Sequence, residues 1–503
     1  MIKNFKWLLL VSLTFAACNS DDETIKDTNS SDGLPLTSGS ADFSKYVALG
    51  DSFAAGFSDN ALFIKGQQGA YPNIIAQQFA LITESTFTTP LTNDNIGGLL
   101  LGGNIISGPR LYLKTSPAIP PNPAPSPVPT PVEGTPTTEA TAHLSGTFNN
   151  LGVPGARSYH LVAAGYGNVA GVPTGKANPY FARFSSSPTT TVLADAISQS
   201  PTFFSLWIGG NDVLGYATSG GSGKDQTGNM DPSTYSGNDI TDPTVFKTVY
   251  TNIINGLTAN GAKGVIANLP NITSLPYFTT VPYNPVALPA DKADQLNAGY
   301  AVYNGGLQQM KTLGLLTADE VAKRTIKFVA GSNAVVIIDS YLTNLSAYGL
   351  PSYRHATKDD LVVLTAMNYI GTSVGGDATK INGVSVPLAD SWVLTKEEIA
   401  EVAKATKLYN ETIKSLSETK NLAILDTEIL MTQIAGAGIV ANGYTVKSTF
   451  VTGGMFSLDG VHPSPRGYAL IANKFIEAIN TKYGSNLKGV DLSNYQILFP
   501  KSL

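Results

Sequence analysis

The chain has 503 residues, of which 43% are hydrophobic and 9% aromatic, so it can bury a large core as one decorated domain or as several domains. Only 14% of the residues are charged, with 32 lysines and arginines against 37 acidic residues. Since this balance provides no basic surface for phosphates, we expect no nucleic-acid partner.

The first residues predict a processing signal. Lys3 and Lys6 precede an apolar run at residues 7–15, which is too short to span a bilayer, and two alanines follow it. Cys18, the only cysteine in the chain, comes next. We therefore expect a signal peptide over residues 1–17. Cys18 could mark a lipoprotein signal, as the next motif suggests, or it could follow an ordinary secretory signal by accident.

The stretch "LTFAAC" resembles the lipobox of bacterial lipoproteins, in which the cysteine sulfur takes a diacylglycerol and its amine a further acyl chain. Two or more chains give stable membrane anchoring. "CNSDDE" also resembles the acidic tag that sends some Gram-negative lipoproteins to the cell surface. These resemblances imply an outer-membrane lipoprotein of the cell envelope, lipidated at Cys18 and facing the periplasm or the cell surface.

Residues 18–44 are predicted to be a flexible tether between the lipid and the folded domain. They are polar, rich in Gly, Ser and Asp, and show no periodicity. A single domain is expected over residues 45–503.

The first elements of that domain are a strand at residues 46–49 and a helix that opens at Tyr71, with Pro72 in its first turn. A Pro-rich segment at residues 116–131 follows. Because proline lacks the backbone donor that a central strand or a helix interior needs, this segment is predicted to be an extended insertion.

Four further apolar runs predict buried strands, at residues 203–208, 265–269, 335–338 and 422–425. Helical patterns separate them. This alternation indicates βαβ units around a parallel sheet.

Two helices close the domain. The first is predicted after Thr395, which forms a capping box with Glu398. The second is predicted at Pro465, with Ser464 as its cap. Each helix carries one apolar stripe that would face a core.

Ser52 stands directly after the first predicted strand and is a candidate nucleophile. A serine hydroxyl needs an adjacent base, a group that orients the base, and donors for the oxyanion. His462 suits the role of base because Asp459 lies three residues before it in a predicted loop, where the two side chains can face each other. The other histidines, His143, His160 and His355, are interpreted as ordinary polar residues.

Two glycine-containing stretches could supply the oxyanion donors. Gly152 and Gly155 follow a probable strand, where a missing side chain lets backbone N–H groups approach a ligand. Asn211 ends the strand at 203–208 in "GGND", with its amide free to donate. Taken singly, these residues are better explained as turn glycines and a helix cap, and only their combination and order favour the catalytic interpretation.

The order of four motifs resembles the SGNH, or GDSL-type, hydrolase family. The motifs are "GDSF" at residues 50–53, "PGA" at 154–156, "GGND" at 209–212 and "DGVH" at 459–462. Phe53 departs from the usual leucine. The glycine-flanked nucleophile elbow of α/β-hydrolases is absent around the serine.

The resemblance implies that Ser52 is the nucleophile and that Asp459 and His462 complete the triad. It also implies an oxyanion hole formed by the N–H groups of Ser52 and Gly155 and the Asn211 side chain. The implied fold is α/β, a three-layer α/β/α sandwich with a flavodoxin-like parallel sheet and large insertions. In such sheets the site lies at the carboxyl ends of the strands.

The long intervals between the motifs predict insertions near residues 90–147, 215–245 and 275–392. Apolar stretches at residues 97–103 and 278–289 could line an acyl groove or a lid. For any single residue of these stretches, packing of the insertions onto the core is the preferred explanation.

These patterns predict a serine esterase or lipase that hydrolyses carboxylic ester bonds, either acyl or acetyl, through an acyl-enzyme intermediate. Its substrate would be a lipid ester or an acetylated carbohydrate. The alternative is a lipid-anchored binding protein on an inactive hydrolase scaffold. No His or Cys cluster has zinc spacing, so neither a metal nor another cofactor is expected.

Overall fold

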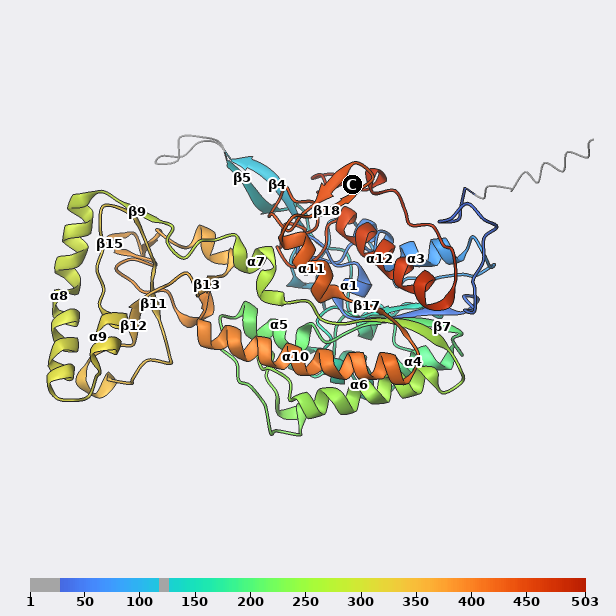
Figure 1. The fold of residues 1–503 in the computed structure, drawn as a ribbon, viewed down its shortest axis with the longest axis horizontal. Coiled ribbons are helices and arrows are strands. Elements are labelled where there is room, and N and C mark those ends of the chain that lie inside the picture. Colours follow the sequence, from blue (N-terminus) through green and yellow to red (C-terminus); the bar gives the residue numbers. More distant parts are fainter. Residues whose placement is uncertain (1–27, 117–125) are drawn as a thin grey trace, which may run out of the picture.

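The computed structural model describes residues 28–116 and 126–503 (Figure 1). The expected signal peptide at 1–17 and the expected lipidation site Cys18 lie outside the described residues. Among the described helices, none is both long enough and apolar enough to cross a bilayer.

Five parallel strands form the central sheet, in the spatial order β17-β8-β7-β1-β6. They are β1 (Tyr46–Gly50), β6 (Asn150–Gly152), β7 (Phe203–Trp207), β8 (Lys263–Ala267) and β17 (Ala423–Leu425). Counted along the chain from one to five, this order is 2-1-3-4-5, which is the flavodoxin-like arrangement. The predicted sheet is confirmed, and its strands at 46–49, 203–208, 265–269 and 422–425 are found within a few residues.

Helices cover both faces of the sheet and make the predicted three layers (Figure 1). One layer holds α3 (Tyr71–Phe79), α11 (Thr427–Ala435) and α12 (Pro465–Tyr483). The other holds α4 (Val192–Ser198), α5 (Asn211–Thr218), α6 (Pro243–Thr258) and α10 (Lys396–Thr419). Because β1 and β7 are buried along their whole length between the layers, their sequences do not alternate between apolar and polar residues.

The caps predicted for the two late helices are present. The Thr395 N–H donates to the Glu398 carboxylate at 2.6 Å, just before α10. The Ser464 hydroxyl accepts from the Gly467 N–H at 3.0 Å at the start of α12. Each contact satisfies a backbone donor that the helix itself leaves unpaired.

The Pro-rich segment forms no part of the sheet. It contributes β5 (Ser126–Pro131), which pairs only with β4 (Leu111–Ser116) in an antiparallel ribbon. A second ribbon joins β2 (Leu99–Leu101) to β3 (Asn104–Ser107). Short helices α1 (Ser52–Ala55) and α2 (Ile64–Gln68) precede them, and a hairpin of β18 (Ile439–Ala441) and β19 (Tyr444–Val446) follows α11.

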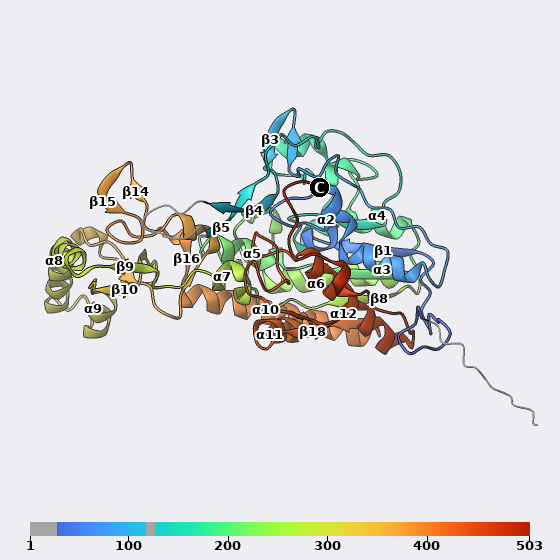
Figure 2. The ribbon, with the colours of Figure 1, turned by 90° about the horizontal axis from the view of Figure 1, so that it is seen from above.

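Residues 281–394 form a lobe that projects from the rest of the molecule, which we call the body (Figure 1 and Figure 2). The short helix α7 (Pro276–Thr279) lies at its base. The lobe contains β9 (Val286–Leu288), α8 (Ala290–Thr312), α9 (Ala318–Arg324), β10 (Gly331–Asn333), β11 (Val336–Ile338), β12 (Tyr353–His355), β13 (Leu361–Val362), β14 (Ser373–Val374), β15 (Asp377–Ile381) and β16 (Val393–Leu394).

The prediction for residues 335–338 was wrong about the sheet to which they belong. They form β11, but this strand pairs with β12 in antiparallel fashion inside the lobe. The run is apolar because the lobe buries it, with Val336 and Ile337 fully covered. Burial in a small antiparallel pair leaves the same sequence signal as burial in a parallel sheet.

The prediction of a free tether over residues 18–44 was wrong for its described part, residues 28–44. The Ser40 N–H donates to the carbonyl of Tyr483 at 2.8 Å, and the Thr37 N–H donates to the Asn486 side chain at the same distance. Phe43 is buried and stacks on Phe79, with ring centroids 3.9 Å apart. This segment is therefore packed against the body near the end of α12.

Candidate active site

The candidate site lies where the strand order reverses. Ser52 follows β1, Asn211 follows β7, and these two strands are neighbours in the sheet. Their carboxyl ends mark the switch point at which crossovers leave toward opposite sides, a common position for binding sites in open α/β sheets.

A tight turn presents Ser52 at the start of α1. The Asp51 side chain caps this helix by accepting from the Phe53 N–H at 3.0 Å. Gly56 ends the helix after one turn. The serine is held on a short rigid segment between the end of a strand and the cap of a helix, and its side chain is largely buried.

The structure brings Ser52, His462 and Asp459 together. The Ser52 Oγ lies 2.9 Å from the His462 Nε2. The His462 Nδ1 lies 3.0 Å from the Asp459 Oδ2. Two residues separated by 410 positions in the chain therefore share a hydrogen bond, in the arrangement that a nucleophile and its base require.

Asp459 is held by backbone donors as well as by the imidazole. Its Oδ1 accepts from the N–H groups of Val461 and His462, each at 2.8 Å. Burial on its own raises the pKa of this carboxyl, but the nearby His462 and these hydrogen bonds outweigh it, so the pKa lies below its ordinary value. The group is therefore a carboxylate at neutral pH and can orient the imidazole and stabilise its protonated form.

Asn211 and Gly155 follow β7 and β6, the two strands that flank β1. The Asn211 Nδ2 donates to the carbonyl of Ala156 at 2.9 Å, which fixes the amide against the turn that holds Gly155. Gly155 has a φ of 77°, a conformation that favours glycine. The second hydrogen of the Asn211 amide remains available as a donor.

The alternative glycine, Gly152, is in a different position. It is the last residue of β6, and its N–H bonds to the Asn150 side chain at 3.0 Å. A Cβ here would lie 2.3 Å from the backbone nitrogen of Ala55. Gly152 is therefore explained by close packing against α1, which leaves Gly155 as the better candidate for an oxyanion donor.

The other histidines lie apart from this group. His143 contacts the carbonyl of Ser185 at 2.9 Å. His160 accepts from the Arg157 N–H, and burial lowers its pKa to about 3, so it is neutral. His355 is in the lobe and accepts from the Lys327 N–H at 3.1 Å. Each has a structural role, as the sequence suggested.

Sequence reasoning missed a turn at residues 58–60 that clamps the loop of Asp459. The Asn60 N–H donates to the Asp459 Oδ2 at 2.9 Å, and the Asp59 N–H donates to the Ser457 Oγ at 3.0 Å. The Asp59 Oδ1 accepts from the Leu458 N–H at 2.9 Å. Asp59 and Asn60 both have positive φ, at 51° and 66°. The one available signal was the "SDN" triplet, because Asp and Asn tolerate this conformation better than most residues.

Two buried carboxyls flank the candidate triad. Burial raises the pKa of Asp51 to about 7, and it does the same for Asp59, to which the nearby Asp459 adds. The Asp59 Oδ2 has no hydrogen-bond partner in the described part of the chain. Both groups therefore titrate near neutral pH and not in the usual range of carboxyls.

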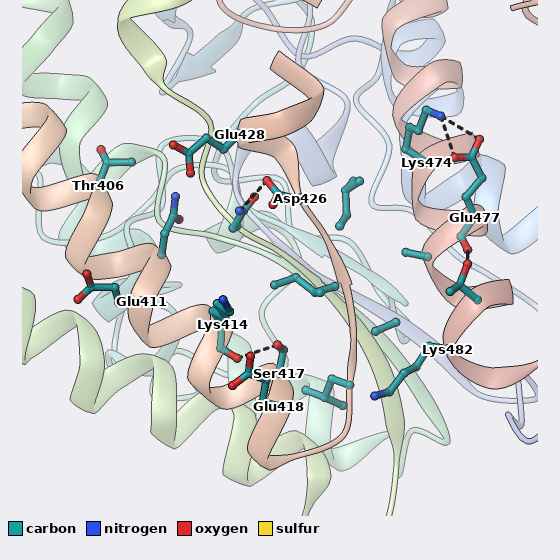
Figure 3. A pocket seen from close by; sticks show the side chains of 18 of the residues that line it. Thr406, Glu411, Lys414, Ser417, Glu418, Asp426, Glu428, Lys474, Glu477 and Lys482 are labelled. Carbon is teal, nitrogen blue, oxygen red and sulfur yellow. Dashed lines mark hydrogen bonds and ion pairs between the residues drawn. The ribbon is translucent and has the colours of Figure 1, made fainter. Parts of the chain in front are cut away.

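A wide groove lies elsewhere in the body. It measures about 1130 Å³ and follows the edge strand β17 between α10 and α12. Figure 3 shows its charged walls, with Lys414 and Glu418 on one side and the ion pair of Lys474 and Glu477 on the other. None of the residues predicted for the site lines it. Across the described ranges, no cluster of three His, Cys, Asp or Glu side chains is suited to a metal ion.

The chain matches a known protein family. A family model, GDSL-like Lipase/Acylhydrolase, covers residues 46–475. This range includes Ser52, Gly155, Asn211, Asp459 and His462. Neither a curated protein nor a solved structure matches the chain.

Proposed function

The chain belongs to the GDSL-like lipase and acylhydrolase family, and from this premise we propose that it is a serine esterase whose nucleophile is Ser52. The observation that carries the proposal is the hydrogen-bonded series Ser52, His462 and Asp459, with links of 2.9 and 3.0 Å. A family of ester hydrolases and this geometry point to the same reaction class.

In the proposed reaction the His462 Nε2 takes the Ser52 proton while the Oγ attacks the ester carbonyl carbon. The negative charge that develops on the carbonyl oxygen is stabilised by the N–H groups of Ser52 and Gly155 and by the Asn211 amide. The imidazolium then returns its proton to the leaving alcohol as the C–O bond breaks. A water molecule repeats these steps on the acyl-enzyme and releases the acid.

Labelling with a fluorophosphonate tests this assignment and separates an esterase from an inactive binding protein. We expect the reagent to modify the wild-type chain at Ser52 and to spare Ser52→Ala. Ser332→Ala, an exposed serine of the lobe, is the matched control and should label normally. Ser52→Ala should also abolish turnover of a p-nitrophenyl ester, and wild-type turnover by this variant would refute the proposal.

We also propose that Cys18 anchors the protein in the outer membrane of the cell envelope. Support comes from the sequence alone, from "LTFAAC" and the lone cysteine that ends it. Metabolic labelling with an alkynyl fatty acid should mark the wild-type chain and leave Cys18→Ser unmarked. Equal labelling of both chains would contradict the anchor.

A further inference from the structure

A small apolar cavity lies beside the candidate triad. Its volume is about 60 Å³. Its wall includes Asp51 and Phe53 on either side of Ser52, Gly210 just before Asn211, and Val461 just before His462. The cavity therefore borders every segment that brings a side chain to the proposed reaction.

The rest of the wall comes from the core of the body. Trp207 ends β7, Leu214 lies on α5, and Leu430 and Met431 lie on α11. Phe53 and Leu214 are half-buried and reach the surface, whereas Leu430 and Met431 are buried. The cavity thus lies between the chain neighbours of Ser52 and the layer of α11 and α12, to which Met431 and Ile471 belong.

The wall offers very few polar groups. The Thr427 hydroxyl is already engaged, because it donates to the carbonyl of Asn268 at 2.6 Å. The Asp51 carboxyl accepts from the Phe53 N–H, and burial raises its pKa to about 7, so it is largely neutral in mildly acidic solution. A sugar ring would find no set of hydrogen-bonding partners here, whereas an alkyl chain needs none.

We propose that this cavity binds the acyl chain of the ester and makes the enzyme selective for short acyl groups of about four carbons. This inference rests on the esterase function proposed above. A volume of about 60 Å³ equals roughly two water molecules in the liquid, so it holds two or three carbons beyond the carbonyl. Ile434 and Ile471 also belong to the wall and are fully buried, so a longer chain would have to displace core side chains.

The apolar stretches that the sequence suggested for an acyl groove do not contribute. No residue of 97–103 or 278–289 lines this cavity. Leu99 instead packs with Ala55, Leu62 and Tyr180 in a separate cluster, and Phe278 joins the main core. The proposed selectivity therefore depends on the sheet and its helices, where the end of β7, α5 and α11 meet.

The first test is a series of p-nitrophenyl esters from two to ten carbons, with kcat/KM measured on the full chain in detergent. Burying one methylene should raise kcat/KM about four-fold, so the butyrate ester should exceed the acetate ester by roughly fifteen-fold. Activity should fall again beyond six carbons. A flat profile, or a rise continuing to ten carbons, would overturn the cavity proposal.

Two variants test whether the preference for acyl-chain length arises in the cavity. Met431→Ala should move the optimum to about six carbons and raise the ratio of hexanoate to butyrate activity roughly ten-fold. Leu214→Trp should fill part of the cavity and lower the ratio of butyrate to acetate activity by a similar factor. Ile429→Ala is the control, because Ile429 is on the same helix but exposed and outside the cavity.

Ratios between substrates are measured on the same active molecules, so partial unfolding of a variant leaves them unchanged. Unaltered ratios in both cavity variants would overturn the proposal. If the chain-length profile differs from the expected one while hydrolysis still depends on Ser52, the cavity proposal is wrong and the esterase proposal stands. If fluorophosphonate does not label the wild-type chain at Ser52, both the esterase proposal and the cavity proposal are wrong.

Discussion

Buried carboxyl groups have different surroundings in the body and in the lobe. In the body, Asp51 and Asp59 are buried beside the candidate triad, and among the described residues neither forms an ion pair. In the lobe, the buried guanidinium of Arg354 lies between Asp339 and Asp360, with hydrogen bonds of 2.6 and 2.8 Å to the latter.

The pKa values follow this difference. Burial raises the pKa of Asp59 to about 7. Burial also acts on Asp360, but the Arg354 guanidinium outweighs it and holds the pKa of that carboxyl below its ordinary value. Charge in the lobe is arranged to hold the lobe together. In the body, Asp51 and Asp59 have no ion-pair partner among the described residues although they lie beside the proposed reaction centre, a kind of place where perturbed carboxyls concentrate.

The largest expected effect comes from the body. Asp459→Asn should lower kcat for a p-nitrophenyl ester by about 10⁴-fold, because an amide stabilises the wrong imidazole tautomer and cannot compensate the imidazolium. Circular dichroism should show an intact fold. The lobe substitution Asp360→Asn, measured well below its melting temperature, should leave kcat near the wild-type value. Similar losses of kcat in the two variants would show that the carboxylates of the body and the lobe do not differ in their effect on catalysis.

The largest effect on stability should come from the lobe. Arg354→Met leaves the buried carboxylate of Asp360 without its cation and leaves Asp339 with only the partly exposed Lys323, and we expect the free energy of unfolding to fall by about 3–5 kcal/mol. Denaturant titration measures this loss. Lys358→Met, which removes an exposed cation from the same lobe, should cost less than about 0.5 kcal/mol. A small effect of Arg354→Met would mean that the buried charges contribute little to the lobe.

Asp59→Asn should alter how stability depends on pH. Asp59 titrates near 3.8 in the unfolded chain and at about 7 in the folded protein. Its contribution is therefore fully present below pH 4 and is lost as the pH rises through 7. Since Asn does not titrate, the unfolding free energy of the variant relative to wild type should increase by about 2–4 kcal/mol from pH 4 to pH 8.

Melting curves at several pH values measure this change. Asp360→Asn provides the opposite case, because the pKa of Asp360 is lowered and its contribution is present at neutral pH and lost only as the pH falls below 4. Parallel pH profiles for wild type and Asp59→Asn would show that Asp59 is ionised in the folded protein at neutral pH.

The sequence predicted the body well because its signals are local. Each apolar run at β1, β7, β8 and β17 is followed by helix-forming sequence, and a chain with four histidines leaves few candidates for a base. The expected partners Ser52 and His462 could be named from motifs although they are 410 residues apart.

What could not be predicted depends on contacts between distant parts of the chain. The turn at Asp59 matters because it meets Leu458, a residue 399 positions away, and composition carries no trace of such a contact. Residues 28–44 looked like a tether because their partners, Tyr483 and Asn486, lie at the other end of the sequence. β11 was assigned to the wrong sheet for the same reason.

The smallest predicted effect concerns two tyrosines, one in the body and one in the lobe, that bind the same carboxylate. Tyr216 of α5 and Tyr341 of the lobe both donate a hydrogen bond to Glu401 on α10. Tyr216 is 2% exposed and Tyr341 is 46% exposed. Water can replace a lost phenol at the exposed site but not at the buried one, where the carboxylate oxygen stays unsatisfied.

Tyr216→Phe should therefore cost about 1 kcal/mol more in unfolding free energy than Tyr341→Phe, which should cost about 0.5 kcal/mol or less. Because the two tyrosines share one acceptor, the double variant should differ from the sum of the single ones. Neither substitution touches the candidate triad, so kcat should stay constant in all three. Equal losses of unfolding free energy in the two single variants would show that burial does not determine the strength of these hydrogen bonds.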